Sequence, residues 1–412
     1  MRRPRTVEVG VMQSADMVLG VLRERGRRGL SLQRLYRQLF NEQLFNEQLF
    51  VMAYGRIDAN DGAMTPGVEG VTPDGMSLEA IREVIGLLRA ERYRFAPVRR
   101  VCIPKKNGTR RPVGVPTWTD KLVGEVGRLV WEAYYEPQCS ARSHGFRSGR
   151  GCHTALDAIA STWTGTTWFI EGDIADCFGS LDHEVMLAML AERIHDGRFL
   201  SLVSGRLRAG YLKDWTWHAT YSGAPPGSVV SPVLSNIYLD RLDTVVEQQL
   251  IPAYTRGTAR RQNRQYGTIT ATICYYRRKG DRDKVKALRK RQKSIPSVEV
   301  HDSGYRRLRY CRYADDHLLG FIGPKAEAEQ IKNQLAAFLR TELKLKLSTE
   351  KTLITHARTR KARFLGYDIW TKQVDTWHTK RRRYTNGNIA LGVPPETINT
   401  RCRTYQRKQP KP

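Results

Sequence analysis

The sequence lacks a long apolar run. No stretch approaches the roughly 20 apolar residues that a membrane-spanning helix needs. The basic N-terminal segment 1–10 has no apolar segment behind it, so it does not have the pattern of a secretory signal. The sequence therefore predicts neither a membrane protein nor a secreted one.

Acidic residues are scarce relative to basic ones. The chain has 41 Asp and Glu against 69 Lys and Arg, a formal net charge of +28 and a pI near 10.1. An excess of this size indicates a polyanionic partner, because opposite charge is what draws such a surface to its ligand. Nucleic acid is the first candidate and a membrane surface the second.

Cysteines are few and scattered. The seven of them form no C-x-x-C pair and no Cys/His cluster with zinc-ligand spacing. We expect reduced thiols, as in a cytosolic protein, and no structural zinc site.

The order of apolar patterns predicts a mixed α/β protein. At 412 residues the chain is long enough for two or three domains. Helical periodicity covers 77–95, with Ser77 as N-cap, and 120–135. Two short strands are expected around the basic Asn-Gly turn within 99–117, and a strand, turn and helix within 166–194. An antiparallel sheet is expected around a hairpin at 308–322.

Two adjacent carboxylates lie inside that hairpin, in the stretch "RYADDHLLG". An isolated Asp315–Asp316 pair would be read as a polar hairpin tip, where Asp is common. Asp173 ends the apolar run "TWFIEGD" and, taken alone, could equally be a turn or capping residue. Three converging carboxylates cannot all stay ionised without cations. Oxygen ligands of this kind suit Mg²⁺, and two such ions about 4 Å apart can catalyse phosphoryl transfer.

The motifs resemble those of reverse transcriptases, specifically the group II intron-encoded kind, the intron maturases. The resemblance covers about residues 30 to 375. "GDIADCF" and "YADD" match the first and third catalytic motifs, and the Gly/Pro-rich "GAPPGS" between them stands in the place of the second. Further matches are "CIPKKNGTRRPVGVP", "SHGFRSGRGCHTAL", "KLKLSTEKT", "ARFLGYDIW" and "AMTPGVEGV". The Val-Thr-Gly signature of retrons is not found.

The resemblance implies a role for particular residues. Asp173, Asp315 and Asp316 would hold two Mg²⁺ ions, with Ile174 beside them at the metals. Phe178 would be the aromatic gate that disfavours a ribose 2′-OH. The remaining nucleotide-site residues would be Lys105 and Arg111 on the triphosphate, Pro226 and Gly227 in the second motif, and Lys351 as proton donor or phosphate contact.

The resemblance also implies a fold and a division into domains. The fold class would be α+β, a right-hand polymerase with fingers and an antiparallel palm sheet. We expect an N-terminal extension with the first fingers helices over 1–95, fingers over 96–165, and a palm over 166–375 with a basic insertion at 250–305. Residues 376–412 would be the start of an incomplete thumb.

Two stretches are strongly basic. Residues 256–293 contain 14 Lys and Arg against two Asp, and 380–412 contain nine against one Glu. Such a run is commonly only a solvated face, but tyrosines are interleaved with the first one, which favours contact with a phosphate backbone. The RNA-binding candidates are Arg256, Arg260, Arg261, Arg264, Arg277, Arg278, Lys279, Arg381, Arg382 and Arg383. The implied partners are group II intron RNA, an RNA template with a DNA primer or target, and dNTPs, in the bacterial cytoplasm near the nucleoid.

Two departures from the family leave alternatives open. The second motif has Pro226 where Gln is expected, and proline offers neither an amide side chain nor a backbone N–H. The thumb is short, and no endonuclease Cys/His pattern is present. An active RNA-directed DNA polymerase, an RNA-binding splicing cofactor with a vestigial polymerase, and a defence or CRISPR-associated relative all fit these features.

Overall fold

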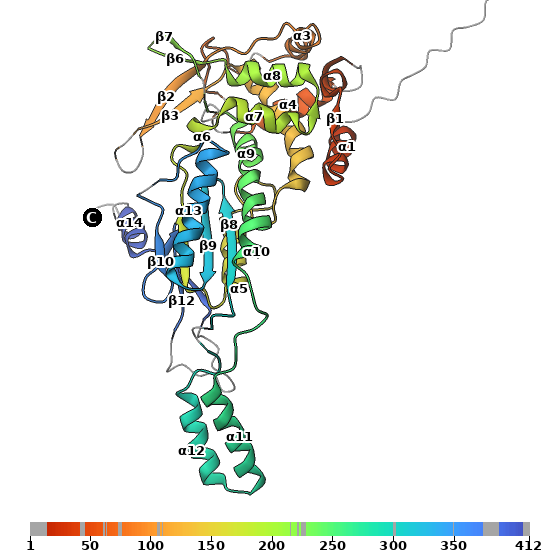
Figure 1. The fold of residues 1–412 in the computed structure, drawn as a ribbon. Helices are drawn as coiled ribbons and strands as arrows, with labels where there is room; N and C mark the ends of the chain where they lie inside the picture. The colour runs from red at the N-terminus through yellow and green to blue at the C-terminus, as the bar shows by residue number, and fades with distance from the viewer. Residues whose placement is uncertain are drawn as a thin grey trace, which may run out of the picture.

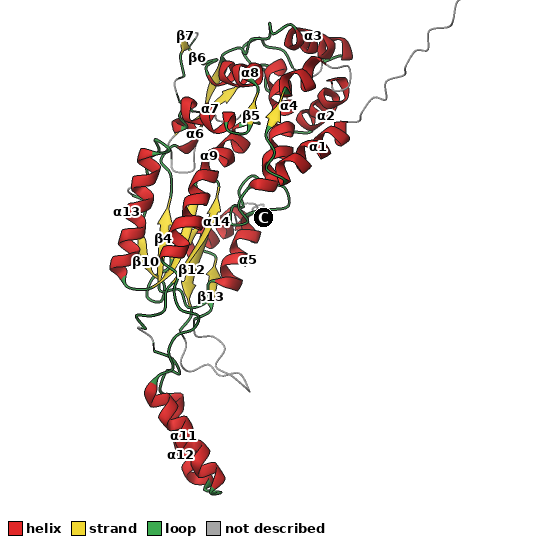
Figure 2. Ribbon diagram, turned by 45° about the vertical axis from the view of Figure 1, so that its right-hand side comes forward, coloured by secondary structure: helices red, strands yellow, loops and turns green. Residues whose placement is uncertain are grey.

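The structure, a computed structural model, consists of two lobes and a projecting arm (Figure 1). We call them the helical lobe, the sheet lobe and the arm, which is residues 262–298. The residues described are 15–41, 46–60, 62, 64–72, 76–104, 108, 110–214, 216–220, 222–223, 228–299, 302–348, 350–373 and 387–406. Figure 2 shows the arm extending away from the sheet lobe on the side remote from the helical lobe.

The helical lobe is built around α4, Trp118–Tyr135, which is buried on almost every side. Its N-terminus is capped by Thr117, whose hydroxyl accepts from the Asp120 amide at 3.1 Å. The expected cap Ser77 likewise accepts from Ala80 at 3.1 Å, although that helix ends at Arg89 rather than near 95. The helices are α1 Ala15–Arg27, η1 Arg37–Asn41, α2 Asn46–Asp58, α3 Leu78–Arg89, α4 Trp118–Tyr135, η3 Glu136–Gln138, α7 His183–Ala191 and α8 Gly197–Leu207.

A small sheet forms the edge of the helical lobe. The expected strand pair around the Asn-Gly turn is confirmed as β2 Val98–Pro104 and β3 Arg110–Val115. The strand order is β3-β2-β6-β7, with β6 Tyr211–Lys213 and β7 Thr216–His218. A short parallel pair, β1 Leu32–Gln33 and β5 Ile194–His195, ties the N-terminal region to the segment between α7 and α8.

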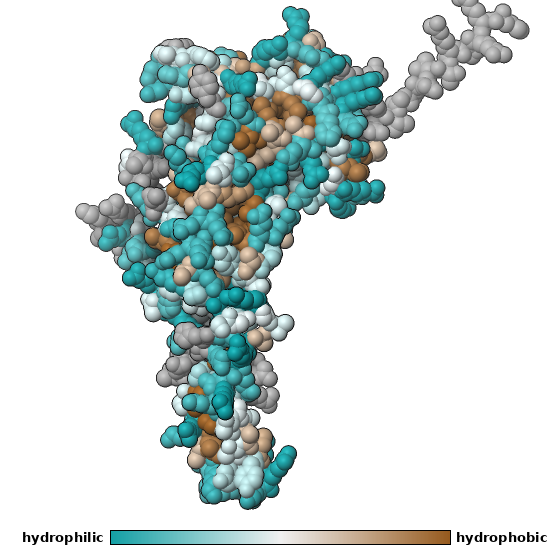
Figure 3. All heavy atoms as spheres, viewed as in Figure 1, coloured by the Kyte–Doolittle hydropathy of each residue, from teal (hydrophilic) through white to brown (hydrophobic). Residues whose placement is uncertain are grey.

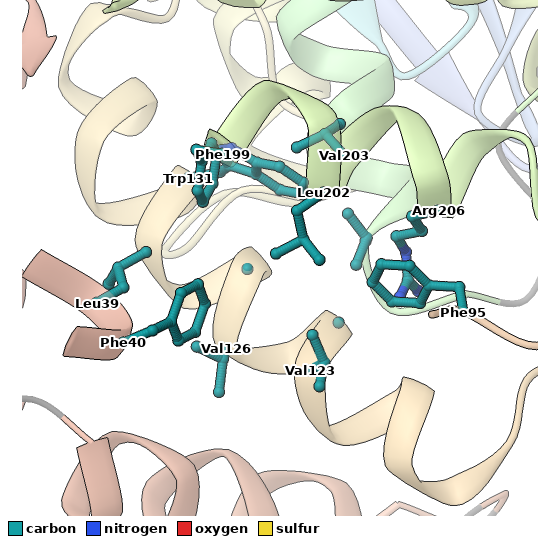
Figure 4. A pocket seen from close by; sticks show the side chains of 13 residues that line it. Leu39, Phe40, Phe95, Val123, Val126, Trp131, Phe199, Leu202, Val203 and Arg206 are labelled. Atoms are coloured by element: carbon teal, nitrogen blue, oxygen red, sulfur yellow. The ribbon is translucent and has the colours of Figure 1, made fainter. Parts of the chain in front are cut away.

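An apolar pocket lies between α4, α8 and the residues of η1 (Figure 4). Phe40, Val126 and Phe199 are among the side chains that line it. Arg206 closes one end, with its guanidinium carbon 5.1 Å from the centre of the Phe95 ring. The pocket therefore belongs to the interior packing of this lobe, with one cation at its margin.

The sheet lobe contains the antiparallel sheet that the sequence predicts. The order is β10-β4-β9-β8, with β4 Trp168–Gly172, β8 Arg307–Tyr313, β9 Asp316–Ile322 and β10 Ile354–His356. All three pairings are antiparallel. The hairpin predicted at 308–322 is thus confirmed as β8 and β9.

Alternate side chains of the sheet enter two different cores, as strand geometry requires. Ile170 and Leu319 face a core shared with α9 Ser231–Val245 and α13 Lys325–Thr341. Phe169 and Leu318 face the opposite core, with α5 Cys152–Thr162 and a second sheet. That sheet is β11-β12-β13, made of β11 Ala362–Phe364, β12 Tyr367–Thr371 and β13 Ile389–Gly392, and it is followed by α14 Pro395–Gln406.

The remaining elements connect these parts. α6 Cys177–Ser180 leaves the sheet towards the helical lobe, and α9 continues through η4 Val246–Leu250 and α10 Ile251–Ala253 towards the arm. The arm is an antiparallel pair of helices, α11 Arg264–Arg278 and α12 Arg282–Lys293, and its surface is largely hydrophilic (Figure 3). Within the described residues we find no helix that has both the length and the apolar character for crossing a bilayer.

Candidate active site

The three carboxylates of the sequence prediction meet at one edge of the central sheet. Asp173 directly follows β4, Asp316 begins β9, and Asp315 lies in the two-residue turn of the β8–β9 hairpin. β4 and β9 are neighbours, with Gly172 opposite His317. This register places Asp173 beside the two aspartates of the hairpin, although Asp173 and Asp315 are 142 positions apart in sequence.

The neighbouring carboxylates of Asp173 and Asp315 raise the affinity of Asp316 for a proton. Burial, a hydrogen bond with Asp173 and the charges of Asp315 and Asp173 raise the pKa of Asp316 to about 7. Lys351 offsets part of this charge, since its Nζ lies 2.7 Å from Asp173 Oδ2. That hydrogen bond raises the pKa of Lys351 in return. The site therefore carries excess negative charge, and a bound cation would stabilise the ionised carboxylates.

The carboxylate oxygens of Asp173, Asp315 and Asp316 suit Mg²⁺, in a site that leaves room for further ligands. Among the described residues, no three His, Cys, Asp or Glu side chains already stand close enough to enclose a metal ion. Mg²⁺ is commonly held by one or two carboxylates with substrate phosphates and water completing its shell, so an unclosed site suits it. Ile174 has its side chain buried and pairs with Leu347, so only its backbone is available to a metal.

A buried arginine supports the turn that carries the aspartates. Arg312 is fully buried at the end of β8 and forms a two-pronged ion pair with Asp243 of α9, at 2.8 and 2.7 Å. It also donates to the carbonyl of Ala314 in the turn, at 3.0 Å, and to Asn236 Oδ1, at 3.1 Å. Asn236 in turn donates to the carbonyl of Gly145, at 2.9 Å. One side chain thus ties the turn to α9 and to the segment 143–147.

The segment 143–147 packs directly on the turn. The backbones of Ser143 and Arg312 form an isolated β-bridge. A Cβ on Gly145 would collide with the backbone of Ala314. Ala314, Phe146 and Asp176 all have left-handed backbone, with φ of 55°, 57° and 44°. Such conformations are costly for residues other than glycine and gather at functional sites.

Aromatic rings stand beside the carboxylates. Phe178, the residue predicted as a gate, lies in α6 shortly after Asp173 and is half-buried. Its ring centre lies 6.2 Å from that of Phe146, which lies 6.4 Å from Tyr313. Phe146 is 53% exposed, so its ring is open to stacking by a flat ligand.

The second catalytic motif is anchored at both ends. Pro226 and Gly227 themselves lie outside the described residues. Before them, the Gly223 amide donates to the Leu181 carbonyl at 2.7 Å. After them, Ser228 accepts from the buried guanidinium of Arg206 at 2.6 Å. The loop therefore begins against α6 and ends against α8.

The other predicted nucleotide-site and RNA-binding residues are only partly described. Lys105 and Arg381, Arg382 and Arg383 lie outside the described residues. Arg111 is placed as backbone in β3, opposite Ile103, without a description of its side chain. The candidates between 256 and 279 lie in the arm or at its base, remote from the carboxylates.

Several supporting residues were missed by the sequence reasoning. Arg312, Asp243 and Asn236 were given no role, although Arg312 lies on the same face of its strand as the buried Leu308 and Tyr310. A charged residue at an interior strand position is the signal that could have found it, because such a charge needs a buried partner. Nothing in the sequence indicates that the partner is Asp243, on a helix 69 positions earlier.

An antiparallel sheet that presents carboxylates at one edge, with a strand pair and helices above that edge, is the arrangement of a nucleic-acid polymerase palm and fingers. The family model described as "Reverse transcriptase (RNA-dependent DNA polymerase)" matches residues 103–369. The chain belongs to the reverse transcriptase family.

Curated relatives point to one branch of that family. The chain is 39% identical over 372 residues to the group II intron-encoded protein LtrA of Lactococcus lactis subsp. cremoris, covering 88% of this chain and 61% of that protein. It is 32% identical over 347 residues to the protein YkfC of Escherichia coli, covering 82% of each. It is 34% identical to an uncharacterized 91 kDa protein in a cob intron of Schizosaccharomyces pombe, covering 89% of this chain and 46% of that protein. The chain thus spans about three-fifths of the length of LtrA.

Proposed function

We propose that the protein is an RNA-directed DNA polymerase of the group II intron type, which binds intron RNA, assists its splicing and copies it into DNA. The observation that carries this proposal is the meeting of Asp173, Asp315 and Asp316 at one sheet edge within a reverse transcriptase domain. The large positive charge supports a nucleic-acid substrate.

In the proposed reaction, a primer 3′-OH attacks the α-phosphate of a dNTP, and pyrophosphate leaves. When bound, two Mg²⁺ ions would activate the attacking hydroxyl and neutralise the leaving group. Asp173, Asp315 and Asp316 would hold them, with the backbone of Ile174 nearby. The Lys351 ammonium, 2.7 Å from Asp173, would then be released towards the triphosphate.

The rest of the nucleotide site would come from both lobes. We assign the triphosphate to Lys105 and Arg111 of the β2–β3 hairpin, and the face of the new base pair to Pro226 and Gly227. Phe178, with Phe146 beside it, would close the ribose side and disfavour a 2′-OH. Support for this assignment comes from the anchoring of the second motif against α6, the helix in which Phe178 lies.

We further propose that residues 96–165 are fingers, that 166–375 are palm, and that a helical extension precedes them. The strand β13 pairs with β12, so the sheet continues beyond position 375 to Gly392. We therefore place the start of the thumb at α14 rather than at 376. The proposed partners, intron RNA and a DNA primer or target, would put the protein in the bacterial cytoplasm at the nucleoid.

The arm and its base are the proposed RNA grip. α11 and α12 carry most of the cations of the basic insertion, and Tyr275 is 53% exposed among them. Exposed cations around an aromatic ring suit a phosphate backbone with its bases. The proposed contacts are Arg256, Arg260, Arg261, Arg264, Arg277, Arg278, Lys279, Arg381, Arg382 and Arg383.

A second candidate is an RNA-binding splicing cofactor whose polymerase is vestigial. Pro226 favours it, because proline cannot supply the amide contacts of the expected Gln. The intact carboxylates favour the polymerase, since a protein that only binds RNA gains nothing from mutual repulsion among them.

Primer extension on an RNA template with dNTPs and Mg²⁺ distinguishes the two. We compare the wild type with Asp315→Ala and with Asp157→Ala, an exposed aspartate of α5 that serves as control. The polymerase proposal expects extension by the wild type and the control, and none by Asp315→Ala. Tight RNA binding by all three without extension by any would replace the polymerase with the splicing cofactor.

A further inference from the structure

A cavity of about 210 Å³ lies at the end of the sheet lobe from which the arm projects. Thr167, just before β4, and Ile322, the last residue of β9, are among its lining residues. Asp173 and Asp316 stand at the other ends of the same two strands. At roughly 3.3 Å per residue, the cavity is therefore about 20 Å from the carboxylates.

The cavity is lined by more positive than negative charge. Arg260, Arg306 and Arg358 face it with His356, against the single carboxylate of Asp302. Arg306 already has a partner, because its Nε lies 2.8 Å from Glu327 Oε2. The guanidinium groups of Arg260 and Arg358 then remain without an ion pair among the described residues.

Asp302 forms no direct ion pair with either of those two groups and acts on Arg260 only through its more distant charge. Its carboxylate accepts from the amides of Arg261 and Gly304, both at 2.8 Å. It also pairs with the Arg261 guanidinium at 3.4 Å. Its charge is thus committed to holding the base of the arm.

Arg260 and Arg358 are half-buried, and within the described part of the chain neither forms an ion pair. Among the described residues, neither has a carboxylate within ion-pairing distance, and Arg260 packs 5.5 Å from the centre of the Tyr305 ring. Burial and the charge of Arg358 lower the pKa of Arg260, while Tyr305 and the more distant Asp302 offset part of this shift, so the two cations repel each other. Burial and Arg358 also lower the pKa of His356, which leaves that imidazole neutral at pH 7.

We propose that this cavity is a binding site for a phosphate group, held between the guanidinium groups of Arg260 and Arg358. The N–H groups of a guanidinium match the geometry of phosphate oxygens. Two guanidinium groups together can balance the charge of a singly or doubly charged phosphate. Ser303 and Tyr305, which also line the cavity, offer hydroxyl donors to the remaining oxygens.

The source of the phosphate that we favour is an RNA backbone, because the basic arm begins at the same place. Asn263 N and Ser297 O, 3.0 Å apart, close the base of the arm directly beyond Arg260 and Arg261. An RNA held along the arm would reach the cavity at its foot. This choice of source rests on the proposed function, whereas the phosphate site itself does not.

The position of the phosphate site separates the binding of RNA from the copying of RNA. A nucleotide at the cavity is about 20 Å from the carboxylates along the strands, so it cannot be the one being copied. The site would therefore anchor a structured part of the bound RNA while another segment passes the carboxylates.

The test uses the full chain with a charge-matched control. Arg260→Gln/Arg358→Gln removes the two cations, and Arg23→Gln/Arg340→Gln removes two exposed ones on α1 and α13. Binding of a labelled structured RNA is measured over a range of salt concentrations. Thermal unfolding is measured with and without inorganic phosphate at constant ionic strength.

We expect the first double variant to bind RNA about tenfold more weakly, with a salt dependence reduced by about one to two phosphate contacts. In phosphate-free buffer it should melt no lower than the wild type, since a repulsion has been removed. This readout also shows that the variant is folded. The control should match the wild type in all three measurements.

Two further outcomes decide the source and the proposal. If RNA binding is unchanged but inorganic phosphate stabilises the wild type and not the first variant, the site takes free phosphate rather than RNA. If both double variants behave alike in both assays, the proposal is overturned. Asp315→Ala should abolish extension yet keep the phosphate effect, so failure of the polymerase and failure of this site are separate results.

Discussion

Lys351 shows how a single residue can serve two states of the site. Its side chain is 68% exposed, yet it reaches Asp173 at 2.7 Å. In this position the ammonium balances part of the carboxylate charge before any cation binds. A metal ion would take over that balance, and the ammonium would then be free to meet a triphosphate. We therefore propose that Lys351 contributes to nucleotide binding rather than to the fold.

We predict that Lys351→Ala raises the KM for dNTP by about tenfold, the order expected for removal of one charge-assisted hydrogen bond. RNA affinity and melting temperature should stay within error. Lys344→Ala is the matched control, since Lys344 makes a similar ion pair with Asp182 at 2.8 Å away from the carboxylates. Steady-state primer extension with varied dNTP measures the effect, and an unchanged KM would remove Lys351 from the nucleotide site.

Asp240 of α9 is a residue whose charge opposes folding. Burial and the neighbouring charge of Asp243 raise the pKa of Asp240 to about 6 from its ordinary value of 3.8. The folded state therefore binds this proton more tightly than the unfolded state. The stability that this proton contributes is full below about pH 4 and decreases as the pH rises through 6.

We predict that Asp240→Asn stabilises the protein by about 1–2 kcal/mol at pH 7.5 and by much less at pH 5. The amide removes the buried charge, and at the lower pH the wild-type carboxyl is already largely protonated. Urea unfolding at the two pH values measures the difference, with the exposed Asp157→Asn as control. A gain that is equal at both pH values would contradict the assigned pKa.

At the scale of elements, the β8–β9 hairpin was predictable from the sequence, whereas the contacts that hold its turn in place were not. Its two strands around "ADD", rich in Tyr, Leu, Phe and Ile, follow from residue pattern alone, as does the position of Asp173 at a strand end. The meeting of the two depends on the pairing of β4 with β9. No local pattern specifies that pairing, and only the family resemblance indicated it.

The support of the hairpin turn is a contact between distant elements. Arg312 joins Asp243 and Asn236 of α9 to Ala314, and Asn236 reaches Gly145. Arg312 stands out as a charge within a strand, but the sequence around Asp243 and Asn236 does not indicate that they contact it. Their relation appears only when α9 packs beneath the sheet, which is why sequence reasoning missed the set.

We predict strong coupling between Arg312 and Asp243. Either Arg312→Met or Asp243→Leu should cost about 3–5 kcal/mol of unfolding free energy, because each leaves a buried charge without its partner. The double variant should cost clearly less than the sum of the two. Denaturant unfolding of all four proteins measures this.

The exposed pair of Arg142 and Glu247, 2.8 Å apart, is the control. Its coupling should be below about 1 kcal/mol, since water screens exposed charges. Additive costs for Arg312 and Asp243 would show that the buried pair is not what holds the turn.

At the scale of the whole molecule, composition indicated a basic insertion, and the structure shows that this insertion forms the arm. A run of basic residues is commonly a solvated face, but here it is carried on two helices that leave the sheet lobe (Figure 1). Neither of the two main hydrophobic cores contains a residue of α11 or α12. The arm can therefore be changed without disturbing the lobes.

We predict that replacing residues 264–296 with two glycines leaves the melting temperature and extension on a short template nearly unchanged. Asn263 and Ser297 are already hydrogen-bonded at 3.0 Å, so a two-residue turn can join them. Affinity for a long structured RNA should fall by about 100-fold or more at moderate salt, because 11 Lys and Arg leave with the arm.

A second variant separates charge from shape. It keeps the arm and neutralises four exposed cations of α12, namely Arg282→Gln, Lys286→Gln, Arg289→Gln and Lys290→Gln. If the arm binds RNA through its phosphates, this variant should bind more weakly and with a shallower salt dependence, by about one unit of slope for each phosphate that is no longer neutralised. If only the deletion weakens binding, the tyrosines of α11 hold the RNA instead. If neither variant changes RNA binding, the grip lies elsewhere on the chain, and the arm has no part in it.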